Sequence, residues 1–289
     1  MLDQREKPQF YLLSLLLAVG TQLILAMDSW RAACQNNFPG WIDAWAEFEA
    51  LQAIASYAFE QPGCIFPELV ECAPMFEAEQ LGPPLIEASR CVCNDVAFND
   101  QSRFYLVTGS NMSGKSTFLR AIGLNTVIAL AGGPVRASSA RLSHLSICAS
   151  LAITDSLLEG RSKFLAEVER LGAMIASNQS GKPILFLIDE IFSGTNSQDR
   201  KIAAESVIHT LLNGGAVGAI STHDLALTEM ADDPAKAGVL VHMESNNPDD
   251  PLDFDYLVKP GVSMRSNAMA IVRMLGISTI RTGSTVMKA

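Results

Sequence analysis

The first third of the chain carries a helical pattern of apolar positions. Apolar residues fill 10–27 almost without interruption, and a second apolar series recurs at spacings of three and four from Trp41 to Phe59. That spacing places the second series on one stripe of a helix. Five prolines then interrupt 61–86, so we expect this segment to connect two regions.

From about Leu85 onward, short apolar runs alternate with helical patterns. The runs expected to form strands are 104–108, 146–153, 184–188, 216–221, 239–243 and 254–258, and the expected helices are 115–130, 163–177, 198–212 and 266–275. Strands that are apolar on both faces and alternate with helices predict a mostly parallel sheet with helices on both faces. The sequence therefore predicts a helical region at 1–73, an α/β domain at 74–277 and a tail at 278–289.

A glycine-rich pattern lies between the strand expected at 104–108 and the helix expected at 115–130. Its residues fit G-x-x-x-x-G-K-[ST]: Gly109, Ser110, Asn111, Met112, Ser113, Gly114, Lys115 and Ser116. The glycines let backbone N–H groups curl around phosphate oxygens at a helix start, where the dipole favours negative charge. We expect Lys115 to reach the β- and γ-phosphates of ATP, and the Ser116 hydroxyl to ligate Mg²⁺.

Two acids and a histidine follow later apolar strands. Asp189 and Glu190 come directly after 184–188, which puts both at the carboxyl edge of a buried strand. We expect Asp189 to hold Mg²⁺ and Glu190 to orient and deprotonate the attacking water. His223 comes just after 216–221, where it can contact the γ-phosphate. The three elements together predict a Mg²⁺-dependent ATPase.

Composition limits the partners. The formal net charge is −10, the sequence pI is near 4.9, and no dense basic run occurs. A duplex-binding surface needs clustered Lys and Arg to displace counterions, so we expect any DNA contact to come from regions outside this chain. Among the six cysteines only Cys91 and Cys93 lie close together, without a second pair at zinc-ligand spacing. This usage is typical of reduced cysteines in a cytoplasmic protein.

The apolar segment 10–27 leaves two interpretations. Its length of 18 residues lies at the lower edge for a membrane span. Asp3 and Glu6 stand where a signal peptide would carry positive charge, which excludes that class of segment. The segment is therefore expected either as a helix buried against the rest of the chain or as a membrane anchor.

The residues that make up the motifs resemble those of the MutS DNA mismatch-repair family, and in particular those of its short bacterial relatives. Four segments carry the resemblance in the family's order: the phosphate loop at 108–117, the ABC-type signature at 155–164 with Glu167, the D-loop at 194–196 after the acid pair, and the switch histidine at 221–223. They lie within about 81–277. The resemblance implies a P-loop NTPase fold of the ABC/MutS type that binds ATP with Mg²⁺, with Thr117 completing the phosphate loop.

The resemblance also implies a homodimer in which two ATPase domains meet head to tail. The residues that would approach the γ-phosphate bound by the partner are Gly160, Arg161 and Ser162, and those that would lie in the D-loop at the interface are Gly194, Thr195 and Asn196. One departure from the family's pattern concerns the residue that stacks on the adenine base. The family places an aromatic residue in a Phe-x-x-Asn context to stack on adenine, whereas this chain has Cys91-Val92-Cys93-Asn94. The adenine-stacking residue is therefore left open.

Two functions remain open at this point. The first is a cytoplasmic, dimeric nucleotide switch in DNA mismatch repair or related DNA transactions. The second is a membrane-associated MutS-like or ABC-like regulatory ATPase with protein partners, which 10–27 and the acidic charge favour. A P-loop small-molecule kinase would leave the signature, the D-loop and His223 unexplained.

Overall fold

The computed structural model describes residues 16–71, 73–151, 163–179, 181–192, 197–231, 237–245, 250 and 253–263. The chain forms two compact units, Met1–Phe59 and Glu60–Ala289. The predicted helix at 266–275 and the tail at 278–289 lie outside the described residues.

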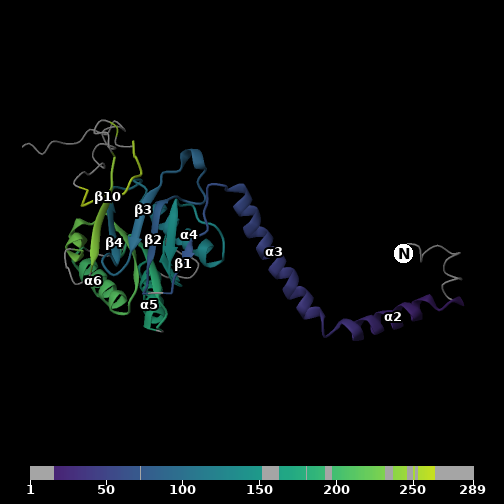
Figure 1. Ribbon diagram of the computed structural model, residues 1–289. Helices are drawn as coiled ribbons and strands as arrows, with labels where there is room; N and C mark the ends of the chain where they lie inside the picture. Colours follow the sequence, from purple (N-terminus) through teal and green to yellow (C-terminus); the bar gives the residue numbers. More distant parts are fainter. Residues whose placement is uncertain are drawn as a thin grey trace, which may run out of the picture. The chain divides into compact units, whose positions relative to one another are not determined.

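Two helices make up the described part of the first unit, α2 (Val19–Cys34) and α3 (Phe38–Glu60, whose last residue lies in the second unit) (Figure 1). The second helix confirms that the residues from Trp41 to Phe59 form a helix, as their spacing predicts. Neither helix buries a residue, so the expectation of a buried helix at 10–27 is not confirmed. Within the part of the chain that the structure describes, no helix has both the length and the apolar character that a membrane span requires.

The second unit is built on a six-stranded sheet, and most of its strands are parallel, as the sequence predicts. Its strands in spatial order are β10 (Lys259–Pro260), β9 (Gly238–Met243), β4 (Phe104–Gly109), β8 (Val217–Thr222), β7 (Ile184–Asp189) and β6 (Ser146–Ser150). Only β10 runs antiparallel to its neighbour. Because β4, β8 and β7 are adjacent and parallel, their carboxyl ends meet at one edge of the sheet.

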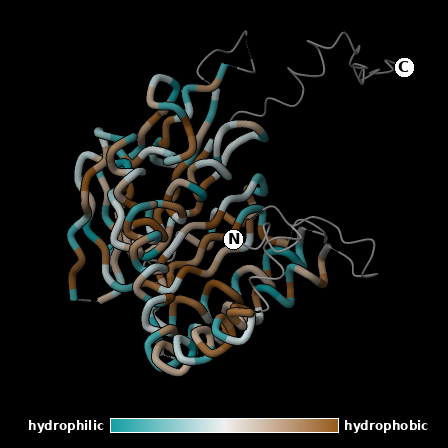
Figure 2. Tube along the Cα trace, turned by 90° about the vertical axis from the view of Figure 1, so that its right-hand side faces the viewer, coloured by the Kyte–Doolittle hydropathy of each residue, from teal (hydrophilic) through white to brown (hydrophobic). Residues whose placement is uncertain are grey.

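Each face of this sheet packs against a different layer. The helix α4 (Lys115–Leu130) covers one face, and α5 (Lys163–Gln179), α6 (Ser197–Asn213) and the 3₁₀ helix η3 (Leu225–Met230) belong to the other. Side chains alternate between the two cores along β7: Leu185 and Leu187 face the α4 side, whereas Phe186 faces the α5 and α6 side. Figure 2 shows hydrophobic positions running through the sheet between these layers. Helices on both faces were predicted, and α4, α5 and α6 confirm it.

A second, four-stranded sheet joins α4 on its face of the first sheet. Its order is β1 (Glu68–Leu69), β5 (Ser139–Leu142), β2 (Phe76–Leu81) and β3 (Asn94–Phe98), with the short 3₁₀ helix η2 (Ala88–Arg90) between β2 and β3. In β2 the side chains of Phe76, Ala78 and Leu81 are buried. The interpretation of 61–86 as a connector was therefore wrong. Its prolines lie outside β1 and β2, so both strands can form between them.

The predicted strand at 254–258 was also wrong. Only Phe254 pairs there, as an isolated bridge to Ser245. Tyr256 has a φ of 57°, a left-handed conformation that a strand does not accommodate. The chain resumes regular pairing only in β10, and the turn before it carries the Tyr256 side chain toward the edge where β4 ends.

Candidate functional site

The phosphate-loop pattern forms the connection between β4 and α4. Gly109, Met112 and Gly114 all have positive φ angles, of 144°, 70° and 102°. A Cβ atom at Gly109 would come within 2.2 Å of the carbonyl oxygen of Met243 on β9, so no other residue fits there without displacing that strand. Gly114 is the N-cap of α4, and the loop therefore ends at the positive pole of a helix.

Lys115 lies inside this loop rather than in solvent. Its side chain is only 5 % exposed, and its Nζ donates hydrogen bonds to the carbonyl oxygens of Gly109 at 2.9 Å and Ser110 at 2.8 Å. Burial lowers the pKa of the Lys115 ammonium, while the nearby carboxylates of Glu190 and Asp189 act in the opposite direction. The loop thus holds a partly desolvated cation beside two acids.

Two serine hydroxyls in the loop are buried without a hydrogen-bond partner among the described residues. These are Ser110 Oγ and Ser113 Oγ. Buried polar groups in proteins are almost always paired, and phosphate oxygens are strong acceptors for hydroxyl and backbone N–H donors. Together with the helix N-terminus and Lys115, these donors make the loop fit an anionic phosphate group.

The two acids lie at the carboxyl end of β7, as predicted. Ser221 on β8 is paired in register with Asp189, and its hydroxyl donates a hydrogen bond to Asp189 Oδ1. The N–H of Glu190 donates to both the carbonyl oxygen and the hydroxyl oxygen of Ser221, each at 3.1 Å. Glu190 itself has a φ of 55°, which turns the chain out of the strand directly after Asp189.

His223 and Glu190 are brought together at the same edge. His223 follows the last residue of β8, and its Nδ1 lies 3.4 Å from Glu190 Oε1. The side chains are 49 % and 36 % exposed, so each can reach a ligand or a water molecule as well as the other. An acid and an imidazole within reach of a phosphate loop can move a proton to or from a bound water.

The oxygen ligands available for a metal ion are few. No group of three or more His, Cys, Asp and Glu side chains able to hold a metal ion occurs among the described residues. Ser116, in the first turn of α4, and Asp189 are the predicted ligands. Mg²⁺ usually keeps several waters and takes one or two protein carboxylates together with phosphate oxygens. The residues present therefore fit Mg²⁺ that arrives with a nucleotide, rather than a metal held by the protein alone.

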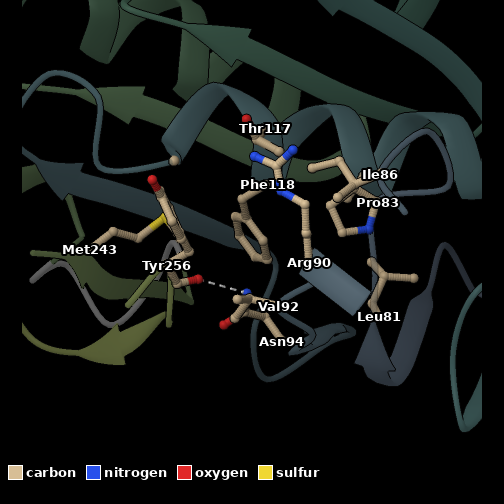
Figure 3. A pocket seen from close by; sticks show the side chains of 12 residues that line it. Leu81, Pro83, Ile86, Arg90, Val92, Asn94, Thr117, Phe118, Met243 and Tyr256 are labelled. Atoms are coloured by element: carbon tan, nitrogen blue, oxygen red, sulfur yellow. Dashed lines mark hydrogen bonds between the residues drawn. The ribbon is translucent and has the colours of Figure 1, made fainter. Parts of the chain in front are cut away.

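A pocket of about 260 Å³ opens beside the phosphate loop (Figure 3). The residues that line it are Leu81, Pro83, Ile86, Arg90, Val92, Asn94, Gly114, Thr117, Phe118, Ala121, Met243 and Tyr256. Arg90 and Tyr256 enter from opposite sides, with Phe118 between them in the view of Figure 3. The pocket is mostly apolar, and its lining also includes the aromatic rings of Phe118 and Tyr256 and the guanidinium group of Arg90.

Tyr256 and Arg90, which both line this pocket, are residues that sequence reasoning missed. The side-chain amide of Asn94 donates to the carbonyl oxygen of Tyr256 at 3.1 Å and accepts the N–H of Val258 at 2.7 Å. These bonds hold the turn that carries Tyr256 against the pocket, across 162 positions of sequence. The only signal was Asn94 itself, which matches the asparagine of Phe-x-x-Asn while no aromatic precedes it.

The residues predicted to act on a partner's nucleotide lie outside the described residues. These are Gly160, Arg161 and Ser162 of the signature and Gly194, Thr195 and Asn196 of the D-loop. The described chain resumes at α5, whose first two residues, Lys163 and Phe164, end the signature segment, and Glu167 on this helix is buried.

Comparison with known proteins gives the site its context. Residues 105–288 match the family described as MutS domain V. The chain is 32 % identical over 200 residues to the DNA mismatch repair protein MutS of Thermotoga petrophila, which covers 67 % of this chain and 24 % of the relative. It is 35 % identical over 217 residues to DNA mismatch repair protein MutS of Brevibacillus brevis, which covers 73 % of this chain and 25 % of the relative. It is 30 % identical over 234 residues to DNA mismatch repair protein MutS 2 of Halobacterium salinarum, which covers 79 % of this chain and 26 % of the relative.

The chain thus spans about a quarter of the length of the curated relatives it matches. The family match begins at the second residue of β4 and includes the phosphate loop, Asp189, Glu190 and His223. By this match and these relatives, the chain belongs to the MutS family.

Proposed function

We propose that this chain is a Mg²⁺-dependent ATPase module of the MutS type, with a P-loop fold of the ABC class spanning 74–277. The single observation that carries the proposal is the phosphate loop. A buried lysine and two buried, unpaired serine hydroxyls converge at the N-terminus of α4. In the bound state the triphosphate replaces the loop carbonyls as the partner of Lys115 and accepts the hydrogen bonds of Ser110 and Ser113.

The base of the nucleotide occupies the pocket next to the loop. Tyr256 stacks on one face of the adenine, and the Arg90 guanidinium covers the other. Both side chains offer flat surfaces to a π-system. The proposal is supported by the position of Gly114, which lines this pocket and also belongs to the phosphate loop. A ligand in the pocket is therefore continuous with one on the loop.

Hydrolysis falls to the residues at the ends of β7 and β8. Asp189 and Ser116 would hold the Mg²⁺ ion, which would supply positive charge against the negative charge of the transferred phosphoryl group. Glu190 accepts a proton from the attacking water. His223, 3.4 Å from Glu190, orients that carboxylate and contacts the γ-phosphate. The positive φ of Glu190 supports this role, because it turns the side chain out of the sheet edge.

The module acts as a dimeric nucleotide switch in DNA mismatch repair or a related DNA transaction. In the dimer Gly160, Arg161 and Ser162 of one subunit approach the γ-phosphate bound by the other, and Gly194, Thr195 and Asn196 lie at the interface. The names of the relatives favour this assignment. Contact with DNA comes through regions outside this chain, in keeping with its net charge of −10.

A second candidate is the same ATPase acting on protein partners. Large apolar side chains of α2 and α3, such as Trp30, Trp41 and Trp45, are more than half exposed, and protein-binding surfaces are rich in such aromatic residues. This feature favours a protein surface over a duplex as the partner of the helical unit.

Equilibrium binding of a fluorescent ATP analogue in the presence of Mg²⁺ tests the phosphate site. Lys115→Ala should abolish binding, because the loop loses the cation that faces the triphosphate. Lys182→Ala is the matched control, since Lys182 is an exposed lysine that precedes β7 and should leave binding unchanged. Binding of wild-type strength in Lys115→Ala would overturn the assignment of the loop.

A further inference from the structure

A chain of charged side chains connects α5, the segment after Glu190 and the residue after His223. It begins at Glu167, which is only 2 % exposed. Glu167 Oε1 accepts a hydrogen bond from the backbone N–H of Phe192 at 2.6 Å. A carboxylate buried to this extent is costly unless it is well paired, so this contact ties α5 firmly to the residue two positions after Glu190.

Arg200 on α6 holds the other backbone group of the same residue, Phe192. Its Nε donates to the carbonyl oxygen of Phe192 at 3.0 Å, and its Nη1 lies 3.1 Å from Asp224 Oδ2. The side chains of Arg200 and Asp224 are only 13 % and 16 % exposed. Because the guanidinium is a rigid fork, one side chain fixes the distance between Phe192 and Asp224.

Asp224 in turn fixes the chain next to His223. Its Oδ1 accepts the N–H of Ala226 at 3.0 Å, and its own N–H donates to Thr222 Oγ1 at 3.0 Å. Asp224 is thereby the cap of η3 and holds both sides of the turn on which His223 stands. A shift of Arg200 would therefore displace the backbone next to His223.

The backbone held by this chain is in an unfavourable conformation. Glu190 and Phe192 have φ angles of 55° and 53°, and neither residue is glycine. Non-glycine residues in this region are strained and persist only where their surroundings hold them. Glu167 and Arg200 supply that hold at Phe192, by binding its N–H and its carbonyl oxygen respectively.

We propose that Arg200 is a positioning residue for ATP hydrolysis, which sets Glu190 and His223 relative to one another through Phe192 and Asp224. The inference rests on the proposed ATPase function. The contacts that place Arg200 in this chain are those to Phe192 and Asp224, next to the proposed hydrolytic residues, so it acts on the rate of hydrolysis rather than on the binding of ATP. Through Glu167 the same chain of contacts reaches α5, the helix that begins with the last two residues of the signature segment.

The test compares Arg200→Met with Lys201→Met in steady-state hydrolysis and in ATP binding. Lys201 is the matched control, since it forms an ion pair with Glu229 and so also joins α6 to η3, but at the surface. For Arg200→Met we expect kcat to fall by about tenfold to a hundredfold, as misplacement of reacting groups does. The affinity for ATP should stay within about threefold of wild type. Lys201→Met should leave both quantities unchanged.

Two further variants separate positioning from a loss of folding. Arg200→Lys can pair with Asp224 or with the Phe192 carbonyl but cannot span both rigidly, so its kcat should lie between those of the wild type and Arg200→Met. Asp224→Asn should lower kcat in the same direction. Combined with Arg200→Met it should add less than its separate effect, because both changes break the same contact.

The outcomes are distinct. Wild-type kcat in Arg200→Met, with wild-type hydrolysis measurable, would overturn the positioning role and leave the ATPase proposal standing. A parallel fall in kcat, ATP affinity and thermal midpoint in Arg200→Met would show a structural role only. Absence of hydrolysis in the wild type would overturn both proposals.

Discussion

The hydroxyl of Ser221 on β8 donates a hydrogen bond to Asp189 on β7, and the two residues stand opposite each other in the parallel register. The same hydroxyl oxygen accepts the N–H of Glu190 at 3.1 Å. Ser221, which is fully buried, therefore orients both Asp189, the proposed metal ligand, and the backbone of Glu190, the proposed general base. It plays this part from the strand that separates β4 from β7.

Ser221→Ala should weaken the use of Mg²⁺. The change removes a donor to the ionised form of Asp189 and leaves that carboxylate free to rotate. We expect the Mg²⁺ concentration for half-maximal hydrolysis to rise several-fold, and stability to fall by about 1 kcal/mol for the lost hydrogen bond. A magnesium titration of the ATPase rate and thermal denaturation measure the two effects. An unchanged titration curve would show that Ser221 does not orient Asp189.

Tyr256→Ala should weaken ATP binding without affecting the phosphate loop. Stacking of a base on an aromatic side chain contributes about 1–3 kcal/mol, so the dissociation constant should rise by roughly tenfold or more. Tyr256→Phe keeps the ring and is the control, with near wild-type affinity. Competition between a fluorescent nucleotide and ATP measures the difference. Equal affinity in Tyr256→Ala and Tyr256→Phe would remove Tyr256 from the base pocket.

The affinity for ATP should depend on pH through Lys115. Burial lowers the pKa of its ammonium in the free protein, whereas bound phosphates favour the charged form. Below the lowered pKa the lysine is already charged and affinity should be flat. As pH rises through that pKa, binding requires uptake of a proton and the affinity should fall. The fall should begin below the ordinary range for lysine.

The control for this pH dependence is Lys115→Arg, which stays charged throughout. Nucleotide binding measured in steps of pH should fall on the alkaline side in the wild type and stay flat in the variant. An equal slope in both proteins would assign the dependence to another group.

Duplex DNA should bind this chain weakly and without preference for a mismatch. Non-specific affinity comes from neutralised phosphates and lies at roughly 10⁻⁴ to 10⁻⁶ M even for proteins with a basic face. A chain with a net charge of −10 should reach only the weak end of that range. Fluorescence anisotropy with matched and mismatched duplexes at physiological salt measures this. Sub-micromolar binding, or a tenfold preference for the mismatch, would place a DNA-contacting surface within this chain.

The strands and helices around the phosphate site could be predicted because each is specified locally. The unbroken apolar run of β7 predicts a buried strand, and the glycines before α4 predict a phosphate-binding turn. The four-stranded sheet could not, since β1 and β2 lie between prolines and pair with partners far along the chain. Glu68, for example, pairs with Arg141.

The base pocket was missed for a similar reason. Tyr256 is held there by the hydrogen bonds of Asn94, 162 positions away, and its own segment was interpreted as a strand. The Arg200–Asp224 ion pair likewise joins residues from two elements whose relative placement no local pattern specifies. Contacts of this kind depend on the packed fold, whereas the motifs depend on the backbone geometry of a single turn.

Glu190→Gln tests the central claim most directly, in a steady-state assay of phosphate release paired with ATP binding on the same preparations. The account predicts that the wild-type chain hydrolyses ATP with Mg²⁺. It predicts that Glu190→Gln binds ATP as tightly but has a turnover rate lower by about a hundredfold or more, since its general base is gone. The variant should also accumulate as a nucleotide-bound dimer. Unchanged hydrolysis in Glu190→Gln would contradict the account and make His223 the candidate base.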